Sequence, residues 1–269
     1  MQADILDRTA PRRLAVAALA AGLMLPLAAR AEPGAPRCDA PLDLLRLAHP
    51  LPRLAQKLAA KDPITIVAIG SSSTAGAGAS SPAASYPSRL AVELRRHFPG
   101  QRFNVINRGV NGEEIADMLK RFDEAIVAAK PDLVLWQLGT NSVIRDHVSG
   151  DHGALIRAGL KKIRSTGADA VLIDPQFAPK VIVKPEAEHM VELISATAKL
   201  EDVDLFRRYE VMKRWHQVDR LGFETIVAPD GLHLNDWSYA CMAKGLGLAI
   251  AEAARRPVMS ATAAHYPVP

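Results

Sequence analysis

The chain has 269 residues, of which 49% are hydrophobic and 23% charged, with a formal net charge of +4. This length suits one domain with a proper core. No block rich in Lys and Arg suggests a nucleic-acid groove. Residues 1–31 contain four arginines and two aspartates, so their removal would lower the net charge to +2.

The first 31 residues have the pattern of a secretory signal peptide. Arg12 and Arg13 precede an apolar run at 14–29, and Ala29-Arg30-Ala31 provides a small-residue cleavage site. A membrane anchor is the alternative, but this run is shorter than the roughly 20 residues that span a bilayer. A twin-arginine route is a further alternative, which the residues around the arginine pair fit poorly. We therefore expect cleavage before Glu32 and a periplasmic or secreted protein without a stable membrane anchor.

Residues 32–62 are expected to form an N-terminal arm and a helix, and the chain's two cysteines are Cys38 and Cys241. Because an exported chain reaches an oxidising compartment, we predict a disulfide between them. It would tie the arm to the last helix and close a very long loop. Two unrelated buried thiols are the alternative. Ala35-Pro36-Arg37 is a poor lipobox, so Cys38 is not expected to carry a lipid.

From residue 63 onward, short apolar runs alternate with amphipathic stretches. We expect strands at 64–69, 103–107, 132–138, 170–173 and 203–206, and helices at 86–97 after a Ser85 cap, 113–129, 155–165, 185–200 and 236–256 after an Asn235 cap. Continuous apolar strands separated by helices predict a buried parallel sheet. The expected fold class is a three-layer α/β/α sandwich around a mostly five-stranded parallel sheet. In such sheets, ligands bind beyond the carboxyl ends of the strands.

The first strand ends in a small-residue segment, Gly70-Ser71-Ser72-Ser73-Thr74. A flexible linker would not normally follow a core strand inside a domain. A phosphate loop would need a Lys after its second Gly, and a dinucleotide fingerprint would need Gly in place of Ser72. The G-x-S-x-G elbow is half present, because Thr74 stands at its second Gly. The segment therefore indicates a strand-to-helix turn that carries a hydroxyl nucleophile.

A serine nucleophile needs a base and a group that orients the base. Asp230-Gly231-Leu232-His233 supplies such a pair. A turn with Gly brings the carboxylate to Nδ1 of the imidazole and leaves Nε2 to take the serine proton. By itself, Asp-x-x-His is common by chance, and His233 can simply cap a loop. Asp174, after the fourth strand, is the less favoured acid because it lacks this spacing.

Acyl transfer also needs hydrogen-bond donors for the oxyanion. Asn107-Arg108-Gly109 follows the second strand, and Gly109 offers a backbone N–H. Asn111-Gly112 is interpreted as a turn before a helix. Gly139-Thr140-Asn141 follows the third strand, and Asn141 offers its side-chain amide unless it only caps a loop. Four further histidines, at 147, 152, 189 and 216, show no metal-ligand spacing, so no metal or other cofactor is expected.

Taken in order, these segments resemble the four sequence blocks of the SGNH (GDSL-type) hydrolases. Gly70–Thr74 resembles the first block, 107–112 the second, Gly139–Asn141 the third and Asp230–His233 the last, over about residues 63–253. The resemblance implies a flavodoxin-like fold and a triad of Ser72 as nucleophile, His233 as base and Asp230 as its partner. It further implies an oxyanion hole from Ser72, Gly109 and Asn141.

Two positions depart from that family. Ser71 and Ser142 stand where the family usually has Asp. Three adjacent serines also leave Ser71 and Ser73 as rivals of Ser72.

The resemblance implies an exported serine ester hydrolase of short-chain O-acyl groups on carbohydrate or small esters. The alternatives are a cell-envelope O-acyltransferase with the same triad, a lipase, lysophospholipase or thioesterase, and a catalytically inactive glycan-binding domain. The expected divisions are a signal peptide at 1–31, the arm and helix at 32–62, the hydrolase domain at 63–257 and a tail at 258–269. The expected partner is an ester substrate, without nucleic acid.

Overall fold

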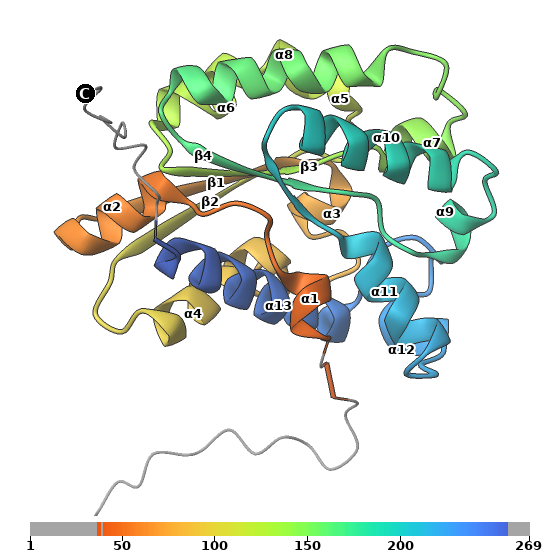
Figure 1. Cartoon of the computed structure of the whole chain (residues 1–269). Helices are drawn as coiled ribbons and strands as arrows, with labels where there is room; N and C mark the ends of the chain where they lie inside the picture. Colours follow the sequence, from red (N-terminus) through yellow and green to blue (C-terminus); the bar gives the residue numbers. More distant parts are fainter. Residues whose placement is uncertain (1–36, 39, 258–269) are drawn as a thin grey trace, which may run out of the picture. The chain divides into compact units, whose positions relative to one another are not determined.

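Five parallel strands form the centre of the protein in the computed structural model, which describes residues 37–257 except residue 39 (Figure 1). Their order is β2-β1-β3-β4-β5, and each neighbouring pair is parallel. The strands are β1 Ile64–Gly70, β2 Phe103–Gly109, β3 Leu133–Gln137, β4 Asp169–Ile173 and β5 Asp204–Phe206. This is the flavodoxin-like strand order, so the predicted fold class is confirmed.

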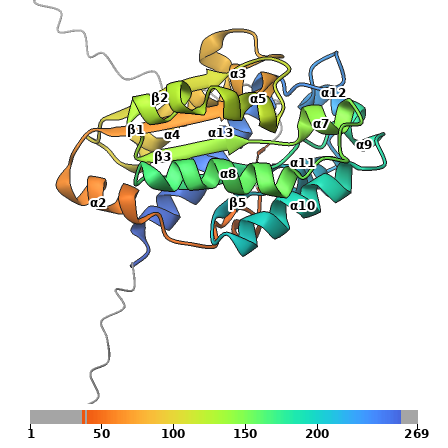
Figure 2. The same cartoon turned by 90° about the horizontal axis from the view of Figure 1, so that it is seen from above.

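Helices cover both faces of the sheet (Figures 1 and 2). α4 and α13 pack against each other on one face, and α5, α8 and α10 lie on the other. The helices are α1 Leu42–Leu45, α2 Pro52–Ala60, α3 Ser72–Ala75, η1 Pro82–Ala84, α4 Tyr86–His97, α5 Ile115–Lys120, α6 Phe122–Ala125, η2 Val127–Ala129, α7 Thr140–Ile144, α8 His152–Ser165, α9 Pro179–Ile182, α10 Ala187–Leu200, α11 Arg208–Gln217, α12 Phe223–Ile226 and α13 Asp236–Arg255.

One sequence-based expectation about the helices was wrong, and another was correct in position only. The helix expected over 113–129 is divided into α5, α6 and η2. The break falls at Arg121, whose guanidinium donates to Glu113 and to the Arg108 carbonyl. Ser85 does precede α4, but its hydroxyl donates to the Pro82 carbonyl instead of capping the helix. By contrast, Asn235 accepts the N–H of Ser238 and caps α13 as expected.

The central strands are buried because helices cover both of their faces. Every residue of β3 is buried, and the Trp136 ring is fully enclosed. Two-sided burial explains why the strands are continuous apolar runs rather than alternating ones. Cys241 belongs to the same core on α13 and Cys38 packs against it, and their pairing stays a prediction.

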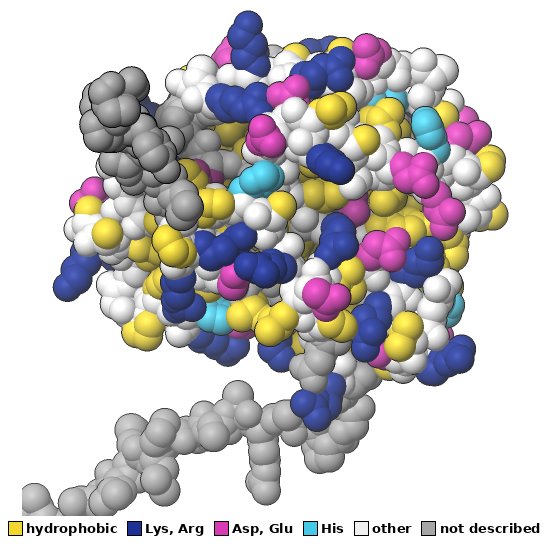
Figure 3. All heavy atoms as spheres, in the orientation of Figure 1, with side chains coloured by type: hydrophobic (Ala, Val, Ile, Leu, Met, Phe, Trp, Pro, Cys, Tyr) yellow, Lys and Arg dark blue, Asp and Glu magenta, His cyan; other side chains and the backbone are white. Residues whose placement is uncertain are grey.

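The surface mixes charges of both signs. On the face shown in Figure 3, basic and acidic side chains are interspersed. Within the residues that the structure describes, no helix has the length and apolarity needed to traverse a membrane. The predicted signal peptide and the tail at 258–269 lie outside the described residues.

Candidate active site

The segment 70–74 connects β1 to the short helix α3, and Ser72 is the first residue of that helix. The turn is tight because Gly70 lacks a side chain. A Cβ at Gly70 would lie 2.2 Å from Thr74 Oγ1 and 2.8 Å from Gln137 Oε1. The expected strand-to-helix turn is therefore present, and it places the Ser72 side chain at the carboxyl end of the sheet.

The three adjacent serines have different partners. Ser72 is partly exposed, and its hydroxyl donates a hydrogen bond of 2.8 Å to His233 Nε2. Ser71 is buried, and its hydroxyl donates to Gln137 Oε1. Ser73 is also buried, with its hydroxyl 3.5 Å from Gln176 Oε1. Of the three, the structure brings Ser72 to the imidazole.

His233 and Asp230 lie on a hairpin between α12 and α13. His233 Nδ1–H donates to Asp230 Oδ2 over 2.5 Å, and Asp230 Oδ1 accepts the backbone N–H groups of Leu232 and His233. These bonds fix the imidazole with its proton on Nδ1, so that Nε2 accepts from Ser72. Residues about 160 positions apart in the sequence thus meet in one line of hydrogen bonds from hydroxyl to imidazole to carboxylate.

The electrostatics of the hairpin favour an ionised Asp230. Burial raises the pKa of the carboxyl, but the hydrogen bonds from the His233 side chain and from two backbone N–H groups outweigh burial and lower the pKa to about 2. The carboxylate is therefore charged at neutral pH. A charged partner stabilises an imidazolium that forms when His233 accepts a proton.

A backbone hydrogen bond within the hairpin and contacts from neighbouring loops hold it in place. The N–H of Ala228 donates to the His233 carbonyl, and the N–H of Lys180 donates to the Gly231 carbonyl. Gly78, with φ of +86°, packs so closely that a Cβ there would lie 2.8 Å from the His233 Cβ. The position of His233 is therefore set by contacts with both the β1–α4 and the β4–α10 connections.

Two of the three predicted oxyanion donors, Gly109 and Asn141, have hydrogen-bond partners in this structure. The N–H of Gly109, the last residue of β2, donates to Asn107 Oδ1 over 2.9 Å. Gly109 was interpreted from the sequence as presenting an open N–H, but this hydrogen bond occupies it. Asn141 is buried in α7, and its Nδ2 donates to the Glu113 carbonyl over 2.8 Å, which leaves one amide hydrogen for another acceptor.

Gly112, interpreted from the sequence as a turn residue, adjoins Glu113 and so lies beside the Asn141 amide. It has φ of +80°, and its carbonyl accepts from Arg145. No hydrogen-bond acceptor for the N–H of Gly112 or of Ser72 is found among the described residues. These two N–H groups are consequently available to a bound oxygen atom.

Ser71 and Ser142, the two departures from Asp, both donate to side-chain oxygens. Ser71 donates to Gln137, and Ser142 Oγ donates to Glu114 Oε2 over 3.1 Å. Glu114 also accepts from Arg145 and His147. Burial raises its pKa, but these three hydrogen bonds outweigh burial and lower it. A carboxylate on the adjoining loop thus lies beside Ser142 and ties that loop to α7.

Sequence reasoning missed the polar side chains beneath the site. Gln137 ends a strand that is otherwise apolar, and Gln176 and Arg208 are buried after β4 and at the start of α11. A polar residue in an apolar strand is a usable signal, and it could have identified Gln137. Nothing local distinguishes Gln176 or Arg208, because their burial depends on contacts between distant segments.

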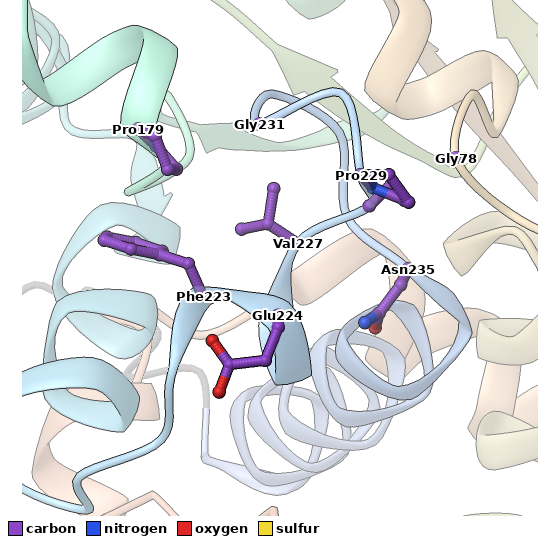
Figure 4. A pocket seen from close by; sticks show the side chains of 9 residues that line it. Gly78, Pro179, Phe223, Glu224, Val227, Pro229, Gly231 and Asn235 are labelled. Atoms are coloured by element: carbon purple, nitrogen blue, oxygen red, sulfur yellow. The ribbon is translucent and has the colours of Figure 1, made fainter.

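A pocket of about 460 Å³ lies beside the Asp230–His233 hairpin (Figure 4). The Phe223 ring at its wall stacks on His216, with ring centroids 4.0 Å apart, and is also stacked on Phe177. The pocket is mainly apolar, with an exposed carboxylate at Glu224. Its lining residues are Gly78, Pro179, Phe223, Glu224, Val227, Ala228, Pro229, Gly231 and Asn235.

Solved structures share this fold. A two-domain esterase active on acetylated mannans aligns with a TM-score of 0.67 and 19% identity, over 84% of this chain and 60% of that one. A G-D-S-L family protein from Desulfitobacterium hafniense DCB-2 aligns with a TM-score of 0.59 and 20% identity, over 69% of this chain and 98% of that one.

A curated relative matches a shorter segment. An acetylxylan esterase from Geobacillus stearothermophilus is 33% identical over 54 residues, which is 20% of this chain and 25% of that protein. The chain thus covers about a quarter of that relative and 60% of the mannan esterase.

The model of the non-GDSL lipase-like family matches residues 37–256. The esterase neighbours and this match support a carboxylic ester hydrolase. The GDSL-type part of the sequence resemblance needs correction, in keeping with Ser71 at the Asp position of the first block. The chain belongs to the non-GDSL lipase-like family.

Proposed function

We propose that the protein is a serine ester hydrolase of the SGNH type, in which Ser72 is the nucleophile, His233 the general base and Asp230 the orienting carboxylate. One observation carries the proposal. The Ser72 hydroxyl donates to His233 Nε2 over 2.8 Å, and Nδ1–H of the same ring donates to Asp230. This is the arrangement of groups that acyl transfer from an ester requires.

The geometry supports a two-step reaction. Ser72 Oγ attacks the ester carbonyl carbon while its proton moves to His233 Nε2. Collapse of the tetrahedral intermediate breaks the bond to the alcohol oxygen, which leaves with the proton from Nε2, and an acyl-serine remains. Water then attacks this ester and gives a proton to Nε2. As the second tetrahedral intermediate collapses, the bond to Ser72 Oγ breaks, the proton passes from Nε2 to Oγ, and the free acid leaves. Asp230 stabilises the imidazolium at each step.

The oxyanion that forms in both steps needs donors near Ser72. We assign the N–H of Ser72 and the second amide hydrogen of Asn141. Gly112 replaces Gly109 as the third donor, because the Gly109 N–H already donates to Asn107 while Gly112 lies next to the Asn141 partner Glu113.

We propose an acylated carbohydrate as the substrate. Two of the similar proteins act on acetylated mannans and on acetylxylan. The pocket beside the hairpin suits a sugar ring, because Phe223 offers a braced aromatic wall and Glu224 an acceptor for hydroxyl groups. The Phe223→Ala variant should raise KM for an acetylated oligosaccharide roughly fivefold or more, since a lost aromatic contact costs about 1 kcal/mol or more.

Hydrolysis of p-nitrophenyl acetate by this variant should stay unchanged, because that ester has no sugar ring. Leu200→Ala, which removes an exposed side chain on α10, is the control. An equal loss on both substrates would contradict a sugar-binding role for the pocket.

The test of the activity is a panel of p-nitrophenyl esters of increasing acyl length, an acyl thioester, a lysophospholipid and acetylated oligosaccharides. Ser72→Ala should lower kcat on short esters on the order of 10⁶-fold, to background. Ser71→Ala and Ser73→Ala should retain turnover, because neither hydroxyl contacts His233. Acylated product on an added sugar, instead of free acid, would favour the O-acyltransferase alternative.

We also propose that the protein is exported and acts in the periplasm or outside the cell. The proposal is based on the basic, apolar and small-residue pattern of residues 1–31. N-terminal sequencing of the protein recovered from each cell fraction should find a chain that begins at Glu32. An intact Met1 on cytoplasmic protein would contradict it.

A further inference from the structure

The Gln176 side chain lies at a junction beneath the proposed active site. It is fully buried in the segment after β4. Its Oε1 accepts from Arg208 Nη2 and from the Thr140 hydroxyl, both over 2.9 Å, and its Nε2 donates to the Leu232 carbonyl over 3.2 Å. One amide therefore contacts three separate connections of the fold.

Two of these contacts, at Leu232 and Thr140, adjoin residues of the proposed reaction. Leu232 directly precedes His233, and Thr140 directly precedes Asn141. The Ser73 hydroxyl, next to Ser72, lies 3.5 Å from the same Gln176 oxygen. The amide consequently lies where it can set the base, an oxyanion donor and the nucleophile relative to one another.

Arg208 determines which way this amide faces. A glutamine can rotate by half a turn and exchange its oxygen and nitrogen. The Thr140 hydroxyl tolerates either orientation, because it can donate or accept. A guanidinium only donates, so Arg208 keeps Oε1 toward itself and thereby directs Nε2 to Leu232. Arg208 Nε is held in turn by the Asp174 carbonyl over 2.9 Å.

The burial of Arg208 is costly for the fold. Its exposed fraction is 1%, and its Nη1 has no hydrogen-bond partner. The charge of Asp174 favours the guanidinium, but the Asp174 side chain accepts from the Tyr209 N–H instead of from Arg208. Burial of a charge without an ion pair destabilises a protein. The buried Arg208 guanidinium is therefore better explained by a role in arranging the active site than by a role in stabilising the fold.

We propose that Gln176 and Arg208 are positioning residues. Arg208 orients the Gln176 amide, and the amide holds the Leu232 carbonyl so that His233 meets Ser72. This inference rests on the proposed function, because it assigns the two residues to the same reaction.

The test is the Gln176→Glu variant. The substitution keeps the shape of the side chain and gives Arg208 a carboxylate partner, so the fold should be at least as stable. It removes the donor to the Leu232 carbonyl and places an oxygen against it. We expect kcat for p-nitrophenyl acetate to fall about tenfold or more with KM changed less than about twofold, since a catalytic group displaced by about 1 Å can cost up to 10²-fold. Thermal unfolding should show no loss of Tm.

The matched control is Asp169→Asn at the opposite end of β4, where the carboxylate accepts the N–H groups of Arg53 and Leu54. It should lower Tm and leave kcat unchanged. Gln176→Met, which fills the site without polar atoms, should also lower kcat and is used if Gln176→Glu does not fold. A folded variant at Gln176 with wild-type kcat would overturn the proposal.

Nitrogen NMR of the His233 ring separates this inference from the proposed function. In wild type, both ring nitrogens should show hydrogen-bonded shifts, and Gln176→Glu should change the Nε2 signal. If wild type hydrolyses no ester but this signal changes, the proposed function fails and the positioning role stands. If wild type is active and neither the signal nor kcat changes in the variant, the positioning role alone fails.

Discussion

Replacement of Gly109 by Ala tests how the end of β2 supports the Ser72 turn. A Cβ at Gly109 would lie 2.1 Å from Ala75 N and 2.6 Å from the Thr74 carbonyl carbon, both in the backbone of α3. An ordinary contact begins at 3.4 Å, so the two backbones would have to separate by about 1.3 Å. A displacement of about 1 Å in an active site costs up to 10²-fold in rate, and overpacking costs about 1–3 kcal/mol in stability.

The assay is kcat/KM for p-nitrophenyl acetate together with the free energy of unfolding from urea denaturation. Gly159→Ala is the matched control, because a Cβ there would also meet an atom at 2.1 Å, in the Trp136 ring under α8. Both variants should be destabilised, and Gly109→Ala alone should lose about 10²-fold in kcat/KM. Wild-type kcat/KM in a destabilised Gly109→Ala would refute the reasoning that β2 positions the nucleophile.

Three further predictions concern carboxylates. Asp230→Asn should lower kcat on the order of 10³–10⁴-fold with little change in KM, because an amide at this position favours the wrong imidazole tautomer. A small effect on kcat in steady-state kinetics would contradict the assignment of Asp230 as the orienting carboxylate. Asp174 is buried, which raises its pKa from 3.8 to about 7, so its contribution to stability is present below about pH 4 and is lost as pH rises through about 7. Urea denaturation of Asp174→Asn should show a gain in the free energy of unfolding over wild type of about 4 kcal/mol or less at about pH 8 and no gain at about pH 4. A loss of stability at the higher pH would contradict a raised pKa for Asp174. Glu114→Gln should destabilise the protein by about 1–3 kcal/mol at neutral pH. Because the pKa of Glu114 is lowered, calorimetry should find that this difference in stability shrinks as pH falls below about 4. A difference that does not depend on pH would contradict a stabilising role for the Glu114 charge.

The fold was predictable because its strands carry a strong signal. The runs at 64–69 and 132–138 are mostly apolar, and this pattern is explained by the burial of β1 and β3 under helices on both sides. The helix over 113–129 was mispredicted because its apolar spacing continues through Arg121. The contacts of Arg121 with Glu113 and Arg108 bend the chain there, and they involve residues outside any helical period.

The placement of candidate site residues followed from strand ends and from the Asp-x-x-His spacing. These features depend on local sequence, so Ser72, Asp230 and His233 could be selected before their distances were known. The Gly109 N–H could not be judged in the same way, because its acceptor is the side chain of Asn107. The same limit applies to Gln176 and Arg208, whose importance comes from contacts with Leu232 and Thr140.

The most direct test of the account is the site at which a fluorophosphonate labels the protein. Such a reagent reacts with a serine that has an adjacent base. Mass spectrometry of the digested protein should find one adduct, on Ser72, which is absent in Ser72→Ala and much slower to form in His233→Ala. An adduct on Ser71 or Ser73, or labelling that persists in Ser72→Ala, would contradict the assignment of the nucleophile.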